Sequence, residues 1–466
     1  MEGLAVREVC VSEPLNTELF RLESEFYTAE TFELDKWFIG SEIIDFVQYG
    51  TSEELNEEFN GYPILRLNEF DSAFIGNPSK YCNLIDKSTY ESLKLKKDDV
   101  LICRTNGNPK LVGKSALVPQ NYEFAYASYL FKIRPKSKLI NSATLVTYLN
   151  SKYGRLEIEK YSMASNQVNF SPAKFRELRI PDFGSILNET IERSVYKSFS
   201  LLEESKTKYQ QAETLLLEAL GLTDFEPSSD PINIKSFKES FLATGRLDAE
   251  YYQKKYEEIN NRLKQFNYLP LGQIVKTKRG TFVSDSYYST EGKIAYLRGA
   301  DISSNKITTT NIVYIDANKQ LRKNDKVKAG NIVFSLIGSV GTAALITDEF
   351  DGCVISNNLG VINIINKLIN PVYLLLYLTN TQIGGLLFAQ QEMRTAQPKI
   401  SDNNIQDFPI PLLADEHQLK LAQLVEESFR LKKESEQLLE TAKRAVEIAI
   451  EKDENAALQF IENANV

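Results

Sequence analysis

The sequence predicts an α+β fold that is built twice: two similar globular modules joined by two long coiled-coil helices, with an internal pseudo-two-fold repeat. Three observations predict this fold. The chain repeats itself, at a constant offset in the later part of each copy and with small shifts upstream; each copy contains short β-branched segments followed by shorter helices, and each copy ends in a long heptad-spaced stretch. With 466 residues, 42% of them hydrophobic, the chain is long enough to bury more than one core.

The repeat is clearest between residues 150–181 and 380–411, which align without a gap at an offset of 230. Eight of these positions are identical, whereas ordinary composition gives about two by chance. Upstream, RLESEFY (21–27) matches RLDAEYY (246–252), and GKSALV (113–118) matches GTAALI (341–346). Because every feature occurs twice in the same order, one structural unit is duplicated.

Each copy has the same order of expected elements. Short runs such as VLIC (100–103) and NIVFSL (331–336) are rich in β-branched or apolar residues and are bounded by Gly, Asn or Asp, as strands are. Residues 142–160 and 372–390 are expected to form helices packed on these strands. Long helices are expected near 186–220 and 415–452. We therefore divide the chain into a first globular domain, a central spacer helix, a second globular domain and a C-terminal spacer helix, at residues 1–184, 185–222, 223–413 and 414–466.

The two long helices carry a heptad seam. Apolar, Ser and Ala residues recur at spacings of four and three over several turns, as a coiled coil requires. A helix of this length spans roughly 50 Å at 1.5 Å per residue. The alternative interpretation is two unrelated amphipathic helices, each packed on its own domain; the shared offset favours a pair. The apolar seam residues are Leu187, Ile191, Leu201, Leu215, Leu421, Leu424, Leu431 and Leu438.

Charge and composition limit the possible functions. The formal net charge is −9, which taken alone argues against nucleic acid as a partner. Acidic residues concentrate in the helical segments, however, and basic residues gather at KTKRG (276–280) and between Arg104 and Lys114. No stretch has the ~20 apolar residues of a membrane helix, and the N-terminus lacks a signal-peptide pattern. We therefore expect a cytoplasmic protein that does not contact a membrane.

No catalytic or metal-binding constellation is expected. The four cysteines lie far apart, and His417 is the only histidine, so closely spaced zinc ligands are missing. The segment IGSVGT (337–342) lacks the lysine of a phosphate-binding loop. NPSKY (77–81) only partly matches the motif of amino-methyltransferases and is best interpreted as a turn. We expect no enzyme activity and no cofactor in this chain.

These features together resemble the specificity subunit of type I restriction-modification systems. The resemblance covers nearly the whole chain and depends on the R-L-[DE]-x-E-[FY]-Y motif before each module. It also depends on KAGNIVFSLIGSVGTAALI (328–346), on SNNLGVINI (356–364), and on the long helix after each module. The first copy departs from the pattern: Asp98 stands where the second copy has Gly330, a four-residue insertion follows, and AYASYLFKI (125–133) replaces an Asn-rich stretch.

The resemblance implies a non-catalytic subunit for DNA methylation and phage defence. Each module would be a target recognition domain that reads half of a bipartite, asymmetric double-stranded DNA target. The two helices would pack antiparallel as a coiled-coil spacer and dock two methyltransferase (modification) subunits, and restriction/translocase subunits would join them. S-adenosylmethionine, ATP and Mg²⁺ would act in those partners. Half-sites about one helical turn apart, roughly 34–36 Å, lie on one face of the duplex, which suits a duplicated protein.

Candidate DNA-contacting residues are those that can bond base edges or phosphates. Residues shared by both modules, such as Arg66 and Arg298, are better interpreted as structural, because the modules should read different sequences. The candidates are Arg104, Thr105, Asn106, Asn108, Lys110, Lys114, Asn166, Gln167 and Asn169 in the first module, and Lys276, Lys278, Arg279, Ser339, Arg394, Gln397 and Lys399 in the second.

Other functions stay open at this point. The chain could serve another methyltransferase-based defence system, or it could be a coiled-coil scaffold whose modules bind protein. A stand-alone nuclease or methyltransferase with degenerate motifs is a third possibility. Binding of S-adenosylmethionine by the isolated chain would favour the last, and a lack of sequence-selective DNA binding would favour the scaffold.

Overall fold

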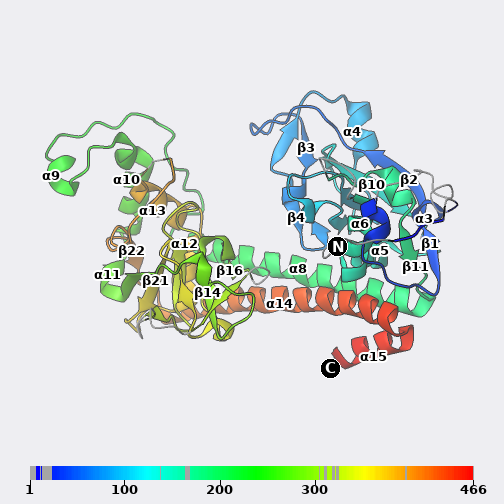
Figure 1. Ribbon diagram of the computed structural model, residues 1–466. Coiled ribbons are helices and arrows are strands. Elements are labelled where there is room, and N and C mark those ends of the chain that lie inside the picture. The colour runs from blue at the N-terminus through cyan, green and yellow to red at the C-terminus, as the bar shows by residue number, and fades with distance from the viewer. Residues whose placement is uncertain are drawn as a thin grey trace. The chain divides into compact units, whose positions relative to one another are not determined.

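The computed structural model describes residues 7–10, 12, 24–136, 138–162, 168–303, 305–308, 312–316, 321, 325–393 and 396–464. The chain divides into two compact units, Met1–Glu204 with Leu431–Val466 and Ser205–Arg430. Each unit combines a globular module with parts of the two long helices, α8 (Ser185–Ala219) and α14 (Asp415–Glu451) (Figure 1).

The first unit contains a six-stranded sheet of order β2-β10-β7-β8-β5-β4, a three-stranded sheet of order β6-β3-β9 and the pair β1-β11. The strands are β1 (Trp37–Ile39), β2 (Ile44–Tyr49), β3 (Tyr62–Leu65), β4 (Phe70–Asp71), β5 (Phe74–Ile75), β6 (Lys80–Cys82), β7 (Val100–Cys103), β8 (Ser115–Leu117), β9 (Ala125–Tyr126), β10 (Leu130–Pro135) and β11 (Arg179–Pro181). The shorter helices are α2 (Ser24–Thr28), α3 (Gly40–Ile43), α4 (Lys87–Leu93), α5 (Ser142–Asn150), α6 (Lys152–Ser162) and α7 (Pro172–Arg176).

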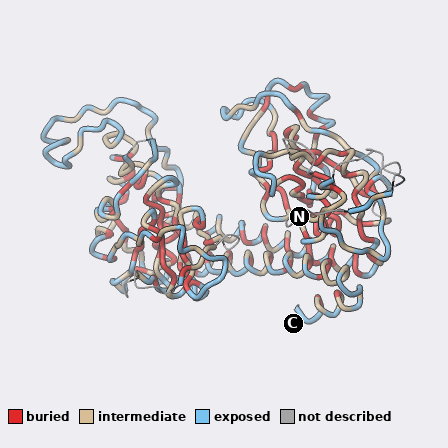
Figure 2. The backbone as a smooth tube through the Cα atoms, in the orientation of Figure 1, coloured by how far each residue is buried: buried red, intermediate tan, exposed pale blue. Residues whose placement is uncertain are grey.

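Both faces of this larger sheet are buried at β7, which explains the continuous apolar run VLIC in that strand. Val100 and Ile102 enter a core that includes residues of α5, α6 and α8, whereas Leu101 and Cys103 enter a second core with residues of β3 and β9. Successive side chains of a strand point to opposite faces, so β7 supplies both cores. Figure 2 shows this buried interior in each module.

The second unit repeats the arrangement with a four-stranded sheet of order β13-β21-β18-β19 and a three-stranded sheet of order β17-β14-β20. Two strand pairs, β12-β22 and β15-β16, accompany them. The strands are β12 (Tyr268–Pro270), β13 (Val275–Arg279), β14 (Ile294–Leu297), β15 (Ile302–Ser303), β16 (Lys306–Ile307), β17 (Val313–Ile315), β18 (Ile332–Ser335), β19 (Ala343–Leu345), β20 (Val354–Ile355), β21 (Leu359–Ile364) and β22 (Pro409–Pro411). The shorter helices are α9 (Phe241–Thr244), α10 (Lys254–Leu263), α11 (Leu271–Ile274), α12 (Pro371–Thr379) and α13 (Gly384–Gln391).

The turn that leads into β7 and into β18 shows how closely the copies correspond. Asp98 has a φ of 68° and Gly330 a φ of 82°, so both adopt the left-handed conformation that favours glycine. The Asp98 N–H donates to the Val118 carbonyl over 2.9 Å, and the Gly330 N–H donates to the Ile346 carbonyl over 2.9 Å. The first copy therefore keeps the turn although it lacks the glycine.

The long helices pack against each other in antiparallel fashion, as the resemblance implies. In the first unit, the hydroxyls of Ser198 and Ser435 each donate to the other residue's carbonyl, over 2.9 and 2.8 Å. In the second unit, Ser205 and Ser428 make the same reciprocal pair, with 2.8 Å in both directions. All four serines are buried. Small side chains at these positions allow the backbones to approach closely enough for side chain-to-carbonyl bonds.

The seam residues are buried to different degrees. Leu187, Ile191, Leu421, Leu431 and Leu438 are buried, and Leu201, Leu215 and Leu424 are half-buried. The adjacent Leu202 and Leu216 are buried instead, in the cores of the first and second units respectively. α8 and α14 therefore each contribute to the cores of both units as well as packing on each other, and their apolar faces are wider than a two-helix seam.

The predicted C-terminal helix over 414–466 is not continuous. α14 ends at Glu451, and α15 (Glu454–Ala464) follows. The Asp453 side chain accepts a hydrogen bond of 2.8 Å from the Ala456 N–H, a cap that starts a new helix. Ala457 and Ile461 of α15 then enter the core of the first unit.

In the described part of the chain, no single helix is long and apolar enough to cross a membrane. One bent pair, Pro371–Thr379 with Gly384–Gln391 at 66°, passes on length and composition alone.

Candidate nucleic-acid interface

In the first module, the loop between β7 and β8 meets the segment that follows α6. The Phe170 N–H donates to the Arg104 carbonyl over 2.8 Å, and Thr105 forms an isolated antiparallel bridge with Asn169. Three candidate residues, Arg104, Thr105 and Asn169, are thereby brought together at one end of the six-stranded sheet.

The second module joins the corresponding segments. The Ile400 N–H donates to the Leu336 carbonyl over 2.9 Å, and Ile337 bridges Lys399. The loop between β18 and β19 contains Ser339, and the segment after α13 contains Gln397 as well as Lys399; all three of these residues are exposed. The two modules therefore place the same pair of segments side by side.

The asparagines of the first loop shape its backbone. The Asn106 side chain accepts a hydrogen bond of 2.8 Å from the Asn108 N–H, and the Asn108 side chain accepts one of 3.1 Å from the Lys110 N–H. Such bonds stabilise turns. Lys110 is exposed, whereas Lys114 is half-buried, and burial lowers the pKa of the Lys114 ammonium. Lys110 is thus the better placed of the two lysines for a phosphate.

Basic residues of the second module also lie on β13. Lys276 and Arg279 are exposed. Lys278 is half-buried, its Nζ donates to the Lys326 carbonyl over 3.2 Å, and burial lowers its pKa. Arg279 ends the strand, and its Nε donates to the Asn357 carbonyl over 2.5 Å.

Three candidates, Asn166, Gln167 and Arg394, lie outside the described residues. Sequence reasoning also missed Tyr49, whose ring centroid lies 5.2 Å from the Arg104 guanidinium carbon. The repeat offset could have identified it, because 279 − 49 equals 230 and Arg279 was already a candidate.

Arg66 and Arg298, which recur in both copies, form internal ion pairs. The Arg66 guanidinium bonds the Glu69 carboxylate over 2.7 Å, and the Arg298 guanidinium bonds the Asp301 carboxylate over 3.0 Å. Each carboxylate also accepts a hydrogen bond from the arginine's own N–H. These contacts fix a 3₁₀ turn in each module, in keeping with a structural role.

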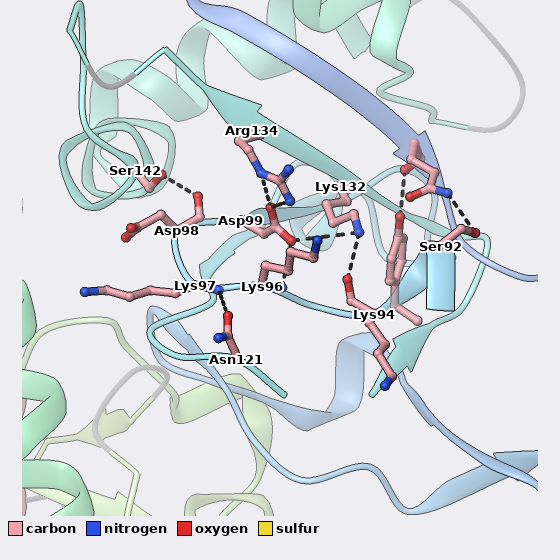
Figure 3. Close-up of polar contacts among 12 residues, drawn as sticks. Ser92, Lys94, Lys96, Lys97, Asp98, Asp99, Asn121, Lys132, Arg134 and Ser142 are labelled. Atoms are coloured by element: carbon pink, nitrogen blue, oxygen red, sulfur yellow. Dashed lines mark hydrogen bonds and ion pairs between the residues drawn. The ribbon is translucent and has the colours of Figure 1, made fainter. Parts of the chain in front are cut away.

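A buried ion cluster distinguishes the first module (Figure 3). The fully buried Asp99 carboxylate accepts two hydrogen bonds from Arg134, of 2.8 and 2.6 Å, and lies 3.8 Å from the Nζ of Lys132. Lys132 is only 2% exposed and also donates to the Lys94 carbonyl over 3.0 Å. Burial lowers the pKa of the Lys132 ammonium to about 8, against the opposing attraction of Asp99.

The second module has uncharged residues at these positions. The strand registers place Lys132 opposite Gln48 and Leu101, and Val361 opposite Lys278 and Val333. Asn331 and Asn363, at the positions of Asp99 and Arg134, bond each other over 3.2 Å. The cluster is therefore an alternative way to fill the same site, not a part of the shared framework.

Residues suited to metal or redox chemistry are sparse. Within the described ranges, no group of three or more His, Cys, Asp or Glu side chains is arranged to hold a metal ion. Cys103 and Cys353 are buried, and burial raises their thiol pKa values to about 11 and about 12. These thiols pack as small apolar groups.

Comparison with known proteins agrees with this arrangement. Residues 264–441 match the family model of the type I restriction modification DNA specificity domain. The EcoKI specificity subunit of Escherichia coli K12 is 23% identical over 302 residues, which cover 63% of this chain and 58% of that protein. The StySPI specificity subunit of Salmonella potsdam is 26% identical over 180 residues, 37% of each chain. The aligned regions thus span about 58% and 37% of the lengths of these curated relatives.

Among solved structures, the type I S subunit from M. genitalium has a TM-score of 0.41 and 14% identity, and covers 90% of this chain and 95% of its own. The HsdS subunit from Thermoanaerobacter tengcongensis has a TM-score of 0.29 and 16% identity, with 91% and 98% covered. The match of residues 264–441 to this family model agrees with the predicted resemblance to type I specificity subunits.

Proposed function

We propose that the chain is the non-catalytic specificity subunit of a type I restriction-modification enzyme, and that each module reads one half of a bipartite, asymmetric DNA target. One observation carries this proposal. Both modules bring the same two segments together at the end of the main sheet, but the residues there differ: Arg104, Thr105 and Asn169 in one, and Leu336, Ile337 and Lys399 in the other. A shared framework that carries different side chains suits two different half-sites.

The direct DNA contacts would come from the polar candidates of these segments and from β13. Phosphate contacts need positive charge, and the chain carries a net charge of −9. We infer that partner subunits supply much of the phosphate binding. Methylation needs S-adenosylmethionine, and translocation and cleavage need ATP and Mg²⁺; in this proposal those ligands act in the modification and restriction subunits.

An exposed apolar segment supports docking of a modification subunit. Within residues 232–247 of the second unit, six large apolar side chains are exposed, from 41% at Phe241 to 89% at Ile234. This segment includes α9 and extends away from the rest of its unit (Figure 1). Patches of this kind mark protein-binding surfaces. Its last two residues begin RLDAEYY (246–252), the motif that matches RLESEFY (21–27), so the segment adjoins a duplicated sequence motif.

The test is to co-express the chain with the methyltransferase encoded beside it and to map methylated adenines by long-read sequencing. We expect two unlike half-sites separated by a fixed, unspecified spacer. A continuous or palindromic motif would contradict the two-module proposal. Exchanging residues 1–184 for the first module of another specificity subunit should change one half-site only. A scaffold function predicts no sequence-selective DNA binding even in the assembled complex.

A further inference from the structure

The strand-end hydrogen bonds identify which residues of the two modules occupy equivalent positions. The Gly50 N–H donates to the Leu130 carbonyl, and the Gly280 N–H donates to the Leu359 carbonyl. Gly50 follows β2 and Gly280 follows β13, so the last residue of β2, Tyr49, corresponds to the last residue of β13, Arg279.

The neighbouring strand gives a second equivalence. The Arg104 N–H donates to the Tyr129 carbonyl over 2.8 Å, and the Leu336 N–H donates to the Asn358 carbonyl over 2.9 Å. Arg104 follows β7 and Leu336 follows β18, so these two residues correspond. The arginine has therefore changed strands between the modules: it follows β7 in the first and ends β13 in the second.

In the first module, Arg104 is positioned by an aromatic ring. Its guanidinium carbon lies 5.2 Å from the ring centroid of Tyr49, and Tyr49 is 46% exposed. Among the residues that the structure describes, no acceptor bonds the buried Nε of Arg104. An aromatic face orients a guanidinium without using its hydrogen-bonding edge. This arginine differs from Arg66, whose guanidinium is bound to a carboxylate.

In the second module, the position of Arg104 is taken by Leu336, which is 1% exposed. Arg279 supplies the guanidinium instead, and its Nε bonds the Asn357 carbonyl. Asn357 precedes Asn358, whose carbonyl accepts the bond from Leu336, so Arg279 is held beside the end of β18. Each module thus presents one arginine at the same end of corresponding sheets.

We propose that Arg104 and Arg279 are the base-reading arginines of the two modules, that each contacts a guanine of its half-site, and that Tyr49 positions Arg104. This inference rests on the proposed function and narrows it to one base in each half-site and one arginine in each module. A guanidinium matches the O6 and N7 acceptors of guanine in the major groove with two parallel bonds. A lysine keeps the charge but does not reproduce that planar fork.

In the experiment, the full chain is assembled with its methyltransferase subunits, and this complex selects DNA duplexes from a randomised library. The wild type should enrich two half-sites, each with a guanine. Arg104→Lys should reduce the preference for guanine at one position of the first half-site by about 10- to 100-fold, with the second half-site unchanged. Arg279→Lys should reduce the preference for guanine in the second half-site and leave the first half-site unchanged. Lys110→Gln is the matched control: loss of a phosphate contact weakens binding to all sequences without changing the motif.

Tyr49 is a positioning residue and is tested by rescue. Tyr49→Leu should relax the same base position as Arg104→Lys, whereas Tyr49→Phe keeps the ring and should keep the base preference. Unchanged preferences in both Arg104→Lys and Arg279→Lys would overturn the assignment of the arginines, even if the wild type enriches a bipartite motif. If the wild type enriches no motif, the proposed function itself fails, and the inference fails with it.

Discussion

Removing one heptad from each long helix tests whether the helix pair sets the spacing between the half-sites. The deletion takes out residues 199–205 of α8 and 429–435 of α14. The two interhelical serine pairs then become one, because Ser198 and Ser428 take the places of their former partners and face each other. The shortened helices keep a matched antiparallel register.

The size of the effect follows from helix geometry. Seven residues at 1.5 Å each shorten the helical connection by about 10.5 Å. A duplex rises by about 3.4 Å per base pair, so the unspecified spacer should shorten by about three base pairs. A duplex turns by roughly 35° per base pair, so three base pairs turn it by about 105°, whereas the loss of one heptad rotates the ends of a helix by only about 20°. The modules would then no longer face their half-sites in the original orientation. We therefore expect weaker binding together with the shorter spacer.

The assay is methylation mapping in cells that carry the variant and its methyltransferase. Both half-sites should keep their sequences, and only the spacer should change. An unchanged spacer in a folded variant would refute the idea that the helices set the distance, and altered half-sites would refute the independence of the modules. Deleting 199–205 alone is the control: it leaves the helices unmatched and should abolish assembly.

Further predictions concern the ion cluster and the apolar segment. Asp99→Asn leaves the buried Lys132 ammonium without a carboxylate and should destabilise the first module by about 3 kcal/mol. The measurement is hydrogen exchange, which should become faster in β7 and β10. Adding Lys132→Val and Arg134→Asn reproduces the second module's residues and should restore slow exchange. The pKa of Lys132 lies at about 8 in the folded chain, against 10.5 for the ordinary group. The folded state therefore holds fewer protons in that range, and stability should rise as the pH increases from 8 to 10.5. Lys132→Met should remove this rise in urea unfolding, and a rise that persists would show that another group causes it. Ile234→Asp should abolish co-purification with the methyltransferase while Lys238→Glu does not; retained co-purification would place docking elsewhere.

The sequence predicted the features that repeat. The offset of 230 was established only from residue 150 onward; the structure shows that it also relates Gly50 and Gly280, which follow β2 and β13 and make corresponding backbone bonds. The sequence also predicted α8 and α14, because heptad spacing over 35 and 37 residues is a strong local signal. The match of Asp98 to Gly330 is confirmed by their shared positive φ.

The remaining features depend on contacts between distant segments. Asp99, Lys132 and Arg134 form one cluster only because β7 and β10 are neighbours in the sheet, and a sequence does not specify strand order. Tyr49 likewise lies near Arg104 although the two residues are far apart in the sequence. The separate helix α15 was not predicted, because residues 414–466 were assigned to one spacer helix, although the polar run EKDEN (451–455) interrupts the apolar pattern and Asp453 is a typical helix-capping residue.

The way in which the loops are anchored would allow the two modules to share a framework and, in the proposed function, to read different half-sites. Gly113 and Gly341 both have positive φ and donate their N–H to the carbonyls of Cys103 and Ser335, which end β7 and β18. Between these anchors the first loop is four residues longer than the second. A backbone bond does not depend on the identity of the side chains nearby, so the length and composition of the loop can change while the sheet stays the same. Arg104 and Arg279 can stand on different strands for the same reason, since main-chain bonds hold this end of the sheet in both modules.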